Sequence, residues 1–410
     1  MQTQLSQEFI EDAGAQQAAA LLRKCVHCGF CNATCPTFQL LGDELDGPRG
    51  RIYLIKQVLE GGDVTRSTQI HLDRCLTCLN CQTTCPSGVE YGRLIDIGRD
   101  LVEERVRRPP LERATRWLLR EGLTSSLFAP ALRLGQALRA WLPERIKEKV
   151  PPRRTEAGPA SPVSQHVSKV LMLQGCVQPA MLPNIDRAAV SVLDAAGIEV
   201  VHAPGTGCCG AVRTHLSDHA GGLDDMRRNI DAWDAQLGAG SVQAVVSSAS
   251  ACALSLKNYG QALADDPKYA HRAARVSASA CDLSELLPRI SAALKDRIRP
   301  GNLGTLAFHP PCTLQHGQKN GGAVESHLRA LGFDVALARD ESHLCCGSAG
   351  TYSILQPQIA GQLRDRKLAA LGVLQPSCIL SANVGCIAHL QSGTTTPVKH
   401  WIEILDEALS

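Results

Sequence analysis

The pattern of apolar and polar residues divides the chain into a helical first quarter and a longer part in which strands and helices alternate. Helical periodicity predicts helices over Ala15–Lys24, Arg51–Leu59 and Val89–Arg105. Farther along, short apolar runs bounded by turn residues predict strands. These strands are expected at Val170–Leu173, Ile198–His202, Ala244–Ser248, Thr305–Phe308, Phe333–Leu337 and Cys378–Ala382.

The strand-and-helix part contains an internal repeat. A predicted helix over residues 184–196 ends before Gly197, and its counterpart over residues 323–331 ends before Gly332, a favourable residue after a helix. Cysteines after the strands recur with offsets of 136, 137 and 134 residues, which chance rarely produces. We therefore expect a multidomain α plus α/β protein, in which a helical domain precedes two tandem α/β lobes with mostly parallel sheets.

A basic segment separates the helical domain from the repeats. From Arg107 to Arg154 there are twelve Lys or Arg residues and four Glu, with apolar residues between them. Two amphipathic helices broken near Ala129-Pro130 are expected, followed by a Pro- and Ala-rich linker from Pro151 to Ser168. The basic face suits anionic lipid or a partner, but we favour an ordinary connector, because such faces are usually only solvated. The expected domains are 1–105, 106–168, 169–298 and 299–410.

Composition narrows the function classes. The 410 residues carry a net charge of only +2 and few aromatic side chains, which argues against a nucleic-acid-binding protein. The first twenty residues lack an apolar secretory core, and no run is long enough to span a membrane. With 18 cysteines and no export signal, metal or redox chemistry is expected in place of disulfides.

Two cysteine runs carry the strongest signal. Each has the form C-x2-C-x2-C-x3-C-P, which holds [4Fe–4S] cubes in two-cluster ferredoxins, where the fourth cysteine ligates the other cluster. The first cluster is therefore assigned to Cys25, Cys28, Cys31 and Cys85. The second is assigned to Cys35, Cys75, Cys78 and Cys81. Structural zinc is the alternative, disfavoured because both runs supply four cysteines and end in Cys-Pro.

The repeats contain a second cysteine pattern, in which one cysteine precedes a Cys-Cys-Gly sequence and another cysteine follows it. The first copy comprises Cys176, Cys208, Cys209 and Cys252, and the second comprises Cys312, Cys345, Cys346 and Cys386. Adjacent thiols rarely form a disulfide with each other and suit a metal or cluster. We expect a further cluster or metal here, against the alternative of inert buried cysteines. Cys281 and Cys378 are read as core residues.

Other polar residues are less informative. His202, His309 and His343 lie beside these cysteines and could be ligands or proton carriers, but we favour hydrogen-bonded turn histidines. Arg49 and Arg51 could raise a cluster potential, although a solvated or partner-facing pair is favoured. No dinucleotide motif follows a predicted strand and no catalytic triad is evident. No catalytic residue and no flavin of its own are therefore expected.

Taken together, the ferredoxin runs, the basic segment and the two Cys-Cys-Gly repeats resemble the iron–sulfur subunits of glycolate oxidase, over nearly the whole chain. Local markers are Asp46–Ile52, Leu72–Cys78, Ala382–Cys386 and Pro397–Leu405. The wider family includes iron–sulfur subunits of anaerobic glycerol-3-phosphate dehydrogenase, lactate-utilisation complexes and heterodisulfide reductase. In heterodisulfide reductases each repeat ends in C-x2-C, whereas Ala249 and Asn383 stand in the earlier position here.

The resemblance implies a function. FAD-containing partner subunits would oxidise glycolate to glyoxylate, and this chain would relay electrons towards a membrane quinone. It would be cytoplasmic and peripherally associated with the inner face of the cytoplasmic membrane. Alternatives are a related lactate or glycerol-3-phosphate dehydrogenase subunit, a disulfide or quinone reductase acting at a Cys-Cys-Gly site, and a scaffold with structural metal only. If one repeat alone binds a cofactor, the second is expected, because Gly385 before Cys386 has no counterpart before Cys252.

Overall fold

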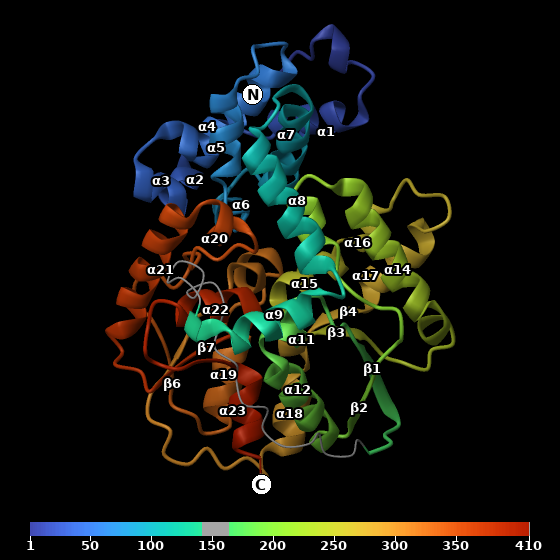
Figure 1. The fold of residues 1–410 in the computed structure, drawn as a ribbon, viewed down its shortest axis with the longest axis vertical. Helices are drawn as coiled ribbons and strands as arrows, with labels where there is room; N and C mark the ends of the chain where they lie inside the picture. The colour runs from blue at the N-terminus through green and yellow to red at the C-terminus, as the bar shows by residue number, and fades with distance from the viewer. Residues whose placement is uncertain (142–163, 410) are drawn as a thin grey trace.

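The computed structural model describes residues 1–141 and 164–409, in which a helical domain lies above two α/β lobes (Figure 1). The helical domain is drawn in blue, the first lobe in green to yellow, and the second lobe in orange to red. The expected fold class is confirmed, because each lobe contains one parallel sheet.

Helices of the N-terminal domain pack around the cysteine runs. Its apolar core includes Leu22, Ile55, Leu59, Leu94 and Ile95, all with 0% exposure. The three predicted helices are present with shifts of at most three residues at their ends. The elements are α1 (Ala13–Arg23), α2 (Phe30–Ala33), α3 (Pro36–Leu41), α4 (Pro48–Leu59), α5 (Arg66–Asp73), α6 (Asn80–Thr84) and α7 (Tyr91–Arg105), with 3-10 turns at Gln7–Phe9 and Glu44–Asp46.

The first lobe has a four-stranded parallel sheet in the order β2-β1-β3-β4. Its strands are β1 (Ser168–Met172), β2 (Ile198–Val201), β3 (Val245–Ser247) and β4 (Ala280–Asp282). Its helices are α11 (Gln178–Met181), α12 (Pro183–Ala195), α13 (Ala211–His215), α14 (His219–Gly238), α15 (Ser250–Lys257), α16 (Tyr259–Ala262), α17 (Ala270–Ser279) and α18 (Leu287–Leu294), with a 3-10 turn at Leu283–Leu286.

The second lobe repeats this topology, with strand order β6-β5-β7-β8. Its strands are β5 (Leu306–Phe308), β6 (Val335–Leu337), β7 (Cys378–Ser381) and β8 (Val398–His400). Its helices are a π-helical turn (Thr313–Gly317), α19 (Ala323–Ala330), α20 (Tyr352–Leu355), α21 (Pro357–Gly372), α22 (Val384–Gln391) and α23 (Trp401–Glu407). The strands β4 and β8 were not predicted from the sequence, because Ala280-Cys281-Asp282 and Val398-Lys399-His400 each include charged or polar residues and form no apolar run.

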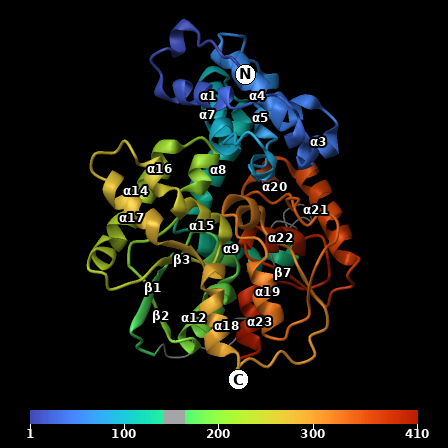
Figure 2. The same cartoon turned by 180° about the vertical axis from the view of Figure 1, so that it is seen from behind.

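The two lobes lie next to each other, as Figure 2 shows from behind, and they share one continuous apolar core. Phe308 and Trp401 of the second lobe share this core with Ile185 and Val192 of the first. The buried His400 Nε2 lies 2.9 Å from the carbonyl oxygen of Ser248, which joins β8 to the first lobe. The two lobes therefore pack into a single folded unit with a shared hydrophobic core.

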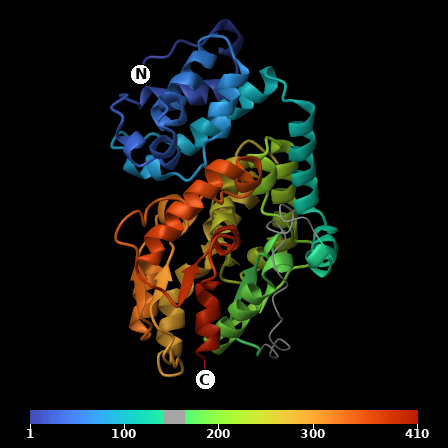
Figure 3. The ribbon, with the colours of Figure 1, turned by 60° about the vertical axis from the view of Figure 1, so that its left-hand side comes forward.

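The basic segment forms the helices α8 (Pro110–Thr124) and α9 (Phe128–Ala137), which run along one side of the molecule (Figure 3). A 3-10 turn over Arg139–Trp141 follows. The break lies between these helices, before Phe128, whereas we predicted it near Ala129-Pro130. Pro130 falls in the first turn of α9, where its missing N–H has no helical partner to lose. The part of the predicted linker from residue 151 to residue 163 lies outside the described residues.

Candidate metal centres

The two N-terminal cysteine loops have the same backbone conformation. In the first, His27 (φ 60°) and Gly29 (φ 86°) are left-handed, and in the second the equivalent Thr77 (φ 52°) and Leu79 (φ 61°) are left-handed. Three of these four residues are not glycine, so the conformation is strained. Such strain is retained where a site requires it. It curls each loop so that its cysteines face a common point.

Backbone amides of these loops point at sulfur. The N–H of His27 donates to Cys25 Sγ and the N–H of Thr77 donates to Cys75 Sγ, both at 3.4 Å. Tyr91 Oη also lies 3.8 Å from Cys75 Sγ. Amide and hydroxyl donors stabilise a thiolate, which is the form that binds iron.

The first ferredoxin-type set converges on a surface cavity. Its lining includes Cys25, Cys28, Cys31 and Cys85, so the fourth cysteine of the second run joins the first three of the first run. Burial, together with the nearby thiols of Cys25, Cys28 and Cys85, raises the pKa of Cys31 to about 11. Cys28 is exposed, so this site opens to the surface.

The second set is buried. Cys35, Cys75, Cys78 and Cys81 are each no more than 8% exposed. Burial raises the pKa of the Cys81 thiol, and the neighbouring thiols of Cys78, Cys75 and Cys35 add to the shift. In each set the structure thus brings the fourth cysteine of one run, Cys85 or Cys35, together with the first three cysteines of the other run.

Thiol spacing distinguishes a cube from a single zinc ion. Ligands around tetrahedral zinc, with bonds of about 2.3 Å to sulfur, lie roughly 3.8 Å apart. In the described ranges 1–141 and 164–409, no three of the eight N-terminal cysteines bring their sulfurs within 4.8 Å of one another. The wider spacing fits the corners of a cluster better than one ion.

Arg51 lies beside the second set, and our expectation of a solvated side chain is wrong for this residue. Its side chain is 1% exposed, lies 3.6 Å from Asp46 Oδ1, and donates from Nε to the carbonyl oxygen of His71 at 2.8 Å. Burial opposes its charge, but the nearby Cys75, Cys35 and Asp46 groups raise the pKa of Arg51 overall. Arg49, by contrast, is partly exposed and pairs with Glu44 at 2.6 Å.

The cysteines of the second lobe gather at the carboxyl ends of its strands. Cys312 Sγ and Cys345 Sγ are 4.0 Å apart. The sulfurs of Cys346 and Cys386 and a ring nitrogen of His309 all lie within 4.8 Å of one another. Lys367, only 2% exposed, donates to the carbonyl oxygen of Glu341 close to these thiols. Burial lowers the pKa of Lys367, while the thiols of Cys346 and Cys345 act in the opposite direction.

The first lobe assembles its four cysteines in the same order. The contact with the Cys208 thiol raises the pKa of Cys176, and burial adds a smaller rise. Cys209 contacts both Cys208 and Cys252, so the four thiols form a continuous series. Two buried polar side chains lie here: Asn229 donates to the carbonyl oxygen of Cys208 at 2.8 Å, and the carboxyl group of Asp225 lies beside the Cys208 thiol. The second site therefore has a buried lysine beside its thiols, where the first has an amide and a carboxyl group.

Glycine is required after each adjacent pair. Gly210 (φ 90°) and Gly347 (φ 89°) are both left-handed, and a Cβ on Gly347 would lie 2.6 Å from the carbonyl oxygen of Ala360. Gly347 N–H also donates to Cys345 Sγ at 3.4 Å. The glycine thus allows the pair to approach the following helix and turns an amide towards sulfur.

The second N-terminal set adjoins the second lobe. Cys78 and Cys345 belong to one buried apolar cluster with Leu76, Tyr352 and Leu363. Tyr352 Oη donates to the carbonyl oxygen of Arg74 at 3.0 Å, and Asn80 Nδ2 donates to that of His343 at 3.3 Å. The sequence did not predict this contact, because its partners are more than 260 residues apart.

The three histidines that lie beside the repeat cysteines differ in their exposure to solvent. His202 and His343 are exposed. His309 is 1% exposed, and among the described residues neither of its ring nitrogens has a hydrogen-bond partner. Our expectation of a hydrogen-bonded turn histidine is therefore wrong for His309. Cys378 is a core residue as expected, while Cys281 is only partly buried in β4.

Comparisons with known families agree with this arrangement. Residues 21–89 match the family described as 4Fe-4S dicluster domain, and residues 170–257 and 306–391 each match the family described as cysteine-rich domain. None of the helices in the described part of the chain combines the length and apolar character needed to cross a bilayer.

Individual relatives resemble the chain along its length. It is 53% identical to the glycolate oxidase iron-sulfur subunit of Escherichia coli (strain K12), an alignment that covers 100% of this chain and 99% of the relative. It is 28% identical to the probable glycolate oxidase iron-sulfur subunit of Bacillus subtilis (strain 168), over 91% and 89% of the two chains. Lactate utilization protein A of Bacillus licheniformis is 26% identical, but the match covers only 58% of this chain.

Proposed function

The chain belongs to the family of glycolate oxidase iron–sulfur subunits, and from this premise we propose that it is the electron-transfer subunit of a flavin-dependent glycolate dehydrogenase. FAD-containing partner subunits oxidise glycolate to glyoxylate, and the electrons leave towards a membrane quinone. The full-length similarity to the Escherichia coli subunit favours glycolate over lactate, since the lactate-utilisation relative matches only part of the chain.

The proposal assigns two [4Fe–4S] clusters to the N-terminal cysteines. Cys25, Cys28, Cys31 and Cys85 hold the first, and Cys35, Cys75, Cys78 and Cys81 hold the second. When bound, such clusters take up and release single electrons. The left-handed loops, the amides directed at sulfur and the two convergent thiol sets support this assignment.

The observation that carries the proposal is the position of the two sets. The exposed Cys28 makes the first set accessible to a partner, whereas Cys78 of the second set packs against Cys345 of the second lobe. Residues of this chain therefore define a route from the surface, through the buried set, to Cys312, Cys345, Cys346 and Cys386, where we place a further redox centre. The chain's own part is to hold, space and screen these groups from water, with no catalytic residue for glycolate.

This proposal is tested with Cys78→Ser in the complex purified with its partner subunits. We expect glycolate to reduce the flavin as before, while reduction of a quinone analogue falls at least tenfold. Cys281→Ser, a cysteine outside all four sets, is the matched control and should leave both steps unchanged. Undiminished quinone reduction by Cys78→Ser would refute the relay, and flavin reduced only by lactate or glycerol-3-phosphate would refute the substrate.

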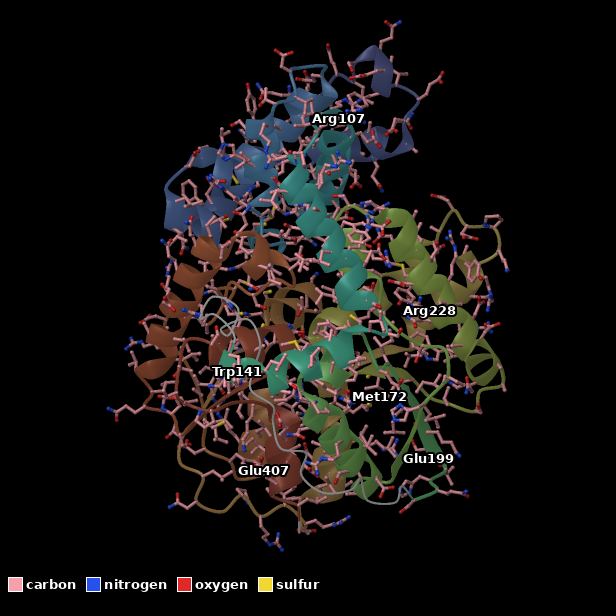
Figure 4. The ribbon with its side chains drawn as sticks, in the orientation of Figure 1. Arg107, Trp141, Met172, Glu199, Arg228 and Glu407 are labelled. Carbon is pink, nitrogen blue, oxygen red and sulfur yellow. The ribbon has the colours of Figure 1, made fainter. Side chains whose placement is uncertain are left out.

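We further propose that the connector is the membrane-facing surface. Neither α8 nor α9 contains a buried residue. Leu127, Leu134, Leu138 and Trp141 are 71%, 61%, 48% and 87% exposed. Leu134 lies within α9, Leu127 and Leu138 flank its two ends, and Trp141 lies in the 3-10 turn that follows. Figure 4 shows Arg107 above α8 and Trp141 near the lower end of the connector. Exposed leucines together with tryptophan and arginine suit an anionic bilayer surface.

Vesicle binding tests this surface. The triple variant Leu127→Ser, Leu134→Ser, Leu138→Ser should lose most of its binding to vesicles that contain anionic lipid, because the inserted apolar area is removed. Val373→Ser changes a residue that is 81% exposed on the second lobe and should bind as the unmodified complex does. Equal binding by the triple variant and the unmodified complex would contradict a membrane-facing connector.

A further inference from the structure

His309 is an unusual buried side chain. It follows β5 at the carboxyl edge of the second sheet and is 1% exposed. In the ranges that the structure describes, both of its ring nitrogens lie in the interior without a hydrogen-bond partner. Buried imidazoles normally have a partner for at least the N–H group. The imidazole of His309 therefore lacks the partner that a buried ring nitrogen normally has.

The nearest suitable groups are thiols. One ring nitrogen of His309 and the sulfurs of Cys346 and Cys386 all lie within 4.8 Å of one another. A metal with bonds of about 2.0 Å to nitrogen and 2.3 Å to sulfur holds such ligands roughly 3.5–3.8 Å apart. Small side-chain shifts would thus bring all three atoms to bonding distance of a single ion. The eight N-terminal cysteines contain no such tight group among the described residues.

The first lobe supplies an internal comparison. Counted back from the first cysteine of each repeat, His309 corresponds to Leu173. Leu173 is likewise buried, at 3% exposure, but it is fully apolar. The histidine is therefore not required by the fold of the repeat, and it occurs in the lobe whose cysteines adjoin the second N-terminal set.

We propose that His309 binds a metal ion through a ring nitrogen, together with Cys346 and Cys386, in a mixed sulfur–nitrogen site that the first lobe lacks. Iron within a cluster and zinc both accept this ligand set. The inference rests on the proposed function only in that the second lobe carries a metal centre. Cys312 and Cys345, whose sulfurs are 4.0 Å apart, lie next along the same site.

The test uses the whole complex purified with its partners, compared with His309→Leu, which installs the residue of the first lobe. We expect His309→Leu to lose metal beyond the iron of the two N-terminal clusters, while the spectra of those clusters stay unchanged. If the metal is iron, pulsed EPR should show a nitrogen coupling that changes when histidine is labelled with ¹⁵N and is absent in the variant. If it is zinc, about one zinc per chain should be lost without any such coupling.

Two further variants complete the design. His309→Cys should retain the metal but lose the nitrogen coupling, which separates ligand loss from misfolding. His202→Leu changes an exposed histidine of the first lobe and should leave metal content and spectra as they are. The proposal is overturned if His309→Leu keeps all its iron and zinc, or if the unmodified chain holds no metal beyond its N-terminal clusters. Neither result depends on glycolate oxidation, so failure of the relay would be recognised separately.

Discussion

At the scale of single residues, Arg51 is a charge held inside the helical domain. It is 1% exposed, lies 3.6 Å from the equally buried Asp46, and sits close to Cys35 and Cys75. Arg74 also donates to Asp46, at 2.8 Å. A fixed positive charge favours the reduced, more negative form of a nearby cluster, so Arg51 should raise the potential of the second cluster.

We therefore expect Arg51→Met to lower the reduction potential of the second cluster and leave that of the first nearly unchanged. Because it leaves Asp46 with fewer partners, it should also cost about 3–5 kcal/mol of stability. Redox titration followed by EPR, together with thermal unfolding, measures both effects. Arg51→Lys, which keeps the charge, is the control and should preserve most of the potential. A potential that stays the same in Arg51→Met would contradict this role.

Asp186 gives a pH-dependent prediction. Burial raises its pKa to about 6, although Ser248 and Gln178 donate to its carboxylate at 3.0 and 2.7 Å. The folded state thus binds the proton more tightly than the unfolded state, and this stabilisation is lost as the pH rises through 6. The first lobe should lose about 1 kcal/mol of stability between pH 5 and pH 7.

Hydrogen exchange of α12, corrected for intrinsic rates, measures this slope. Asp186→Asn removes the titrating group, and the opening free energy of α12 should then be nearly independent of pH over the same range. A slope that persists in Asp186→Asn would assign the effect to another group.

The residues that sequence reasoning identified and those it missed differ in kind. The cysteine sets were predictable because ligand spacing is a local property of the chain. The burial of Arg51 and the unpartnered state of His309 depend on what packs around them from distant segments, such as Thr37 and His71 around Arg51. Local pattern therefore favoured a solvated arginine and a satisfied histidine, and both interpretations were wrong.

At the scale of elements, the turn after Cys346 depends on glycine. Gly347→Ala places a Cβ 2.6 Å from the carbonyl oxygen of Ala360 at a φ of 89°. Because the obstacle is backbone, we expect a loss of several kcal/mol and reduced occupancy of the second-lobe centre. Gly361→Ala, in the helix that follows, meets nothing within 4 Å and should stabilise the protein by about 0.5–1 kcal/mol. Thermal unfolding and metal analysis measure the stability and the metal content of both variants. Equal stability of Gly347→Ala and Gly361→Ala would refute the close approach of Gly347 to the backbone of Ala360.

Most elements followed from their hydrophobic period, and the exceptions have simple causes. The helices α1, α4 and α7 and six strands of the two sheets were predicted at or near their observed bounds. The edge strands β4 and β8 were not, since each mixes apolar with polar or charged residues and shows no apolar run. They belong to the sheets because β3 and β7 offer free backbone groups, a tertiary condition that no local pattern records.

At the scale of the whole molecule, the two repeats are equivalent in topology but not in position relative to the helical domain. Cys345 packs beside Cys78, whereas its counterpart Cys208 has no place in that buried cluster. We expect Cys345→Ser to slow quinone reduction by the glycolate-reduced complex by at least tenfold, and Cys208→Ser to change it less than twofold. Stopped-flow absorbance of the clusters measures both. A larger effect of Cys208→Ser than of Cys345→Ser would contradict an electron path through the second lobe and favour one through the first.

Both lobes touch the helical domain, the first through His219 Nε2, which lies 2.6 Å from Asp100 Oδ1. The sequence predicted the number and type of these lobes, but not which one places its cysteines beside those of the helical domain. The repeat offsets describe each lobe separately, and both lobes carry the same cysteine pattern. The choice depends on surface complementarity, including the contacts of Tyr352 with Arg74 and of Asn80 with His343. These pairs join loops that are far apart in the chain and have no periodic signature.

The unequal exposure of the two N-terminal cysteine sets has a consequence for handling the protein in air. Cys28 of the first set is exposed and Cys31 and Cys85 are partly so, whereas every cysteine of the second set is buried. Oxygen and chelators reach exposed sulfur and iron first. Aerobic purification should therefore strip the outer cluster and leave the inner one, so a preparation that has lost half the iron of its two N-terminal clusters would be uniformly damaged rather than a mixture of intact and empty chains.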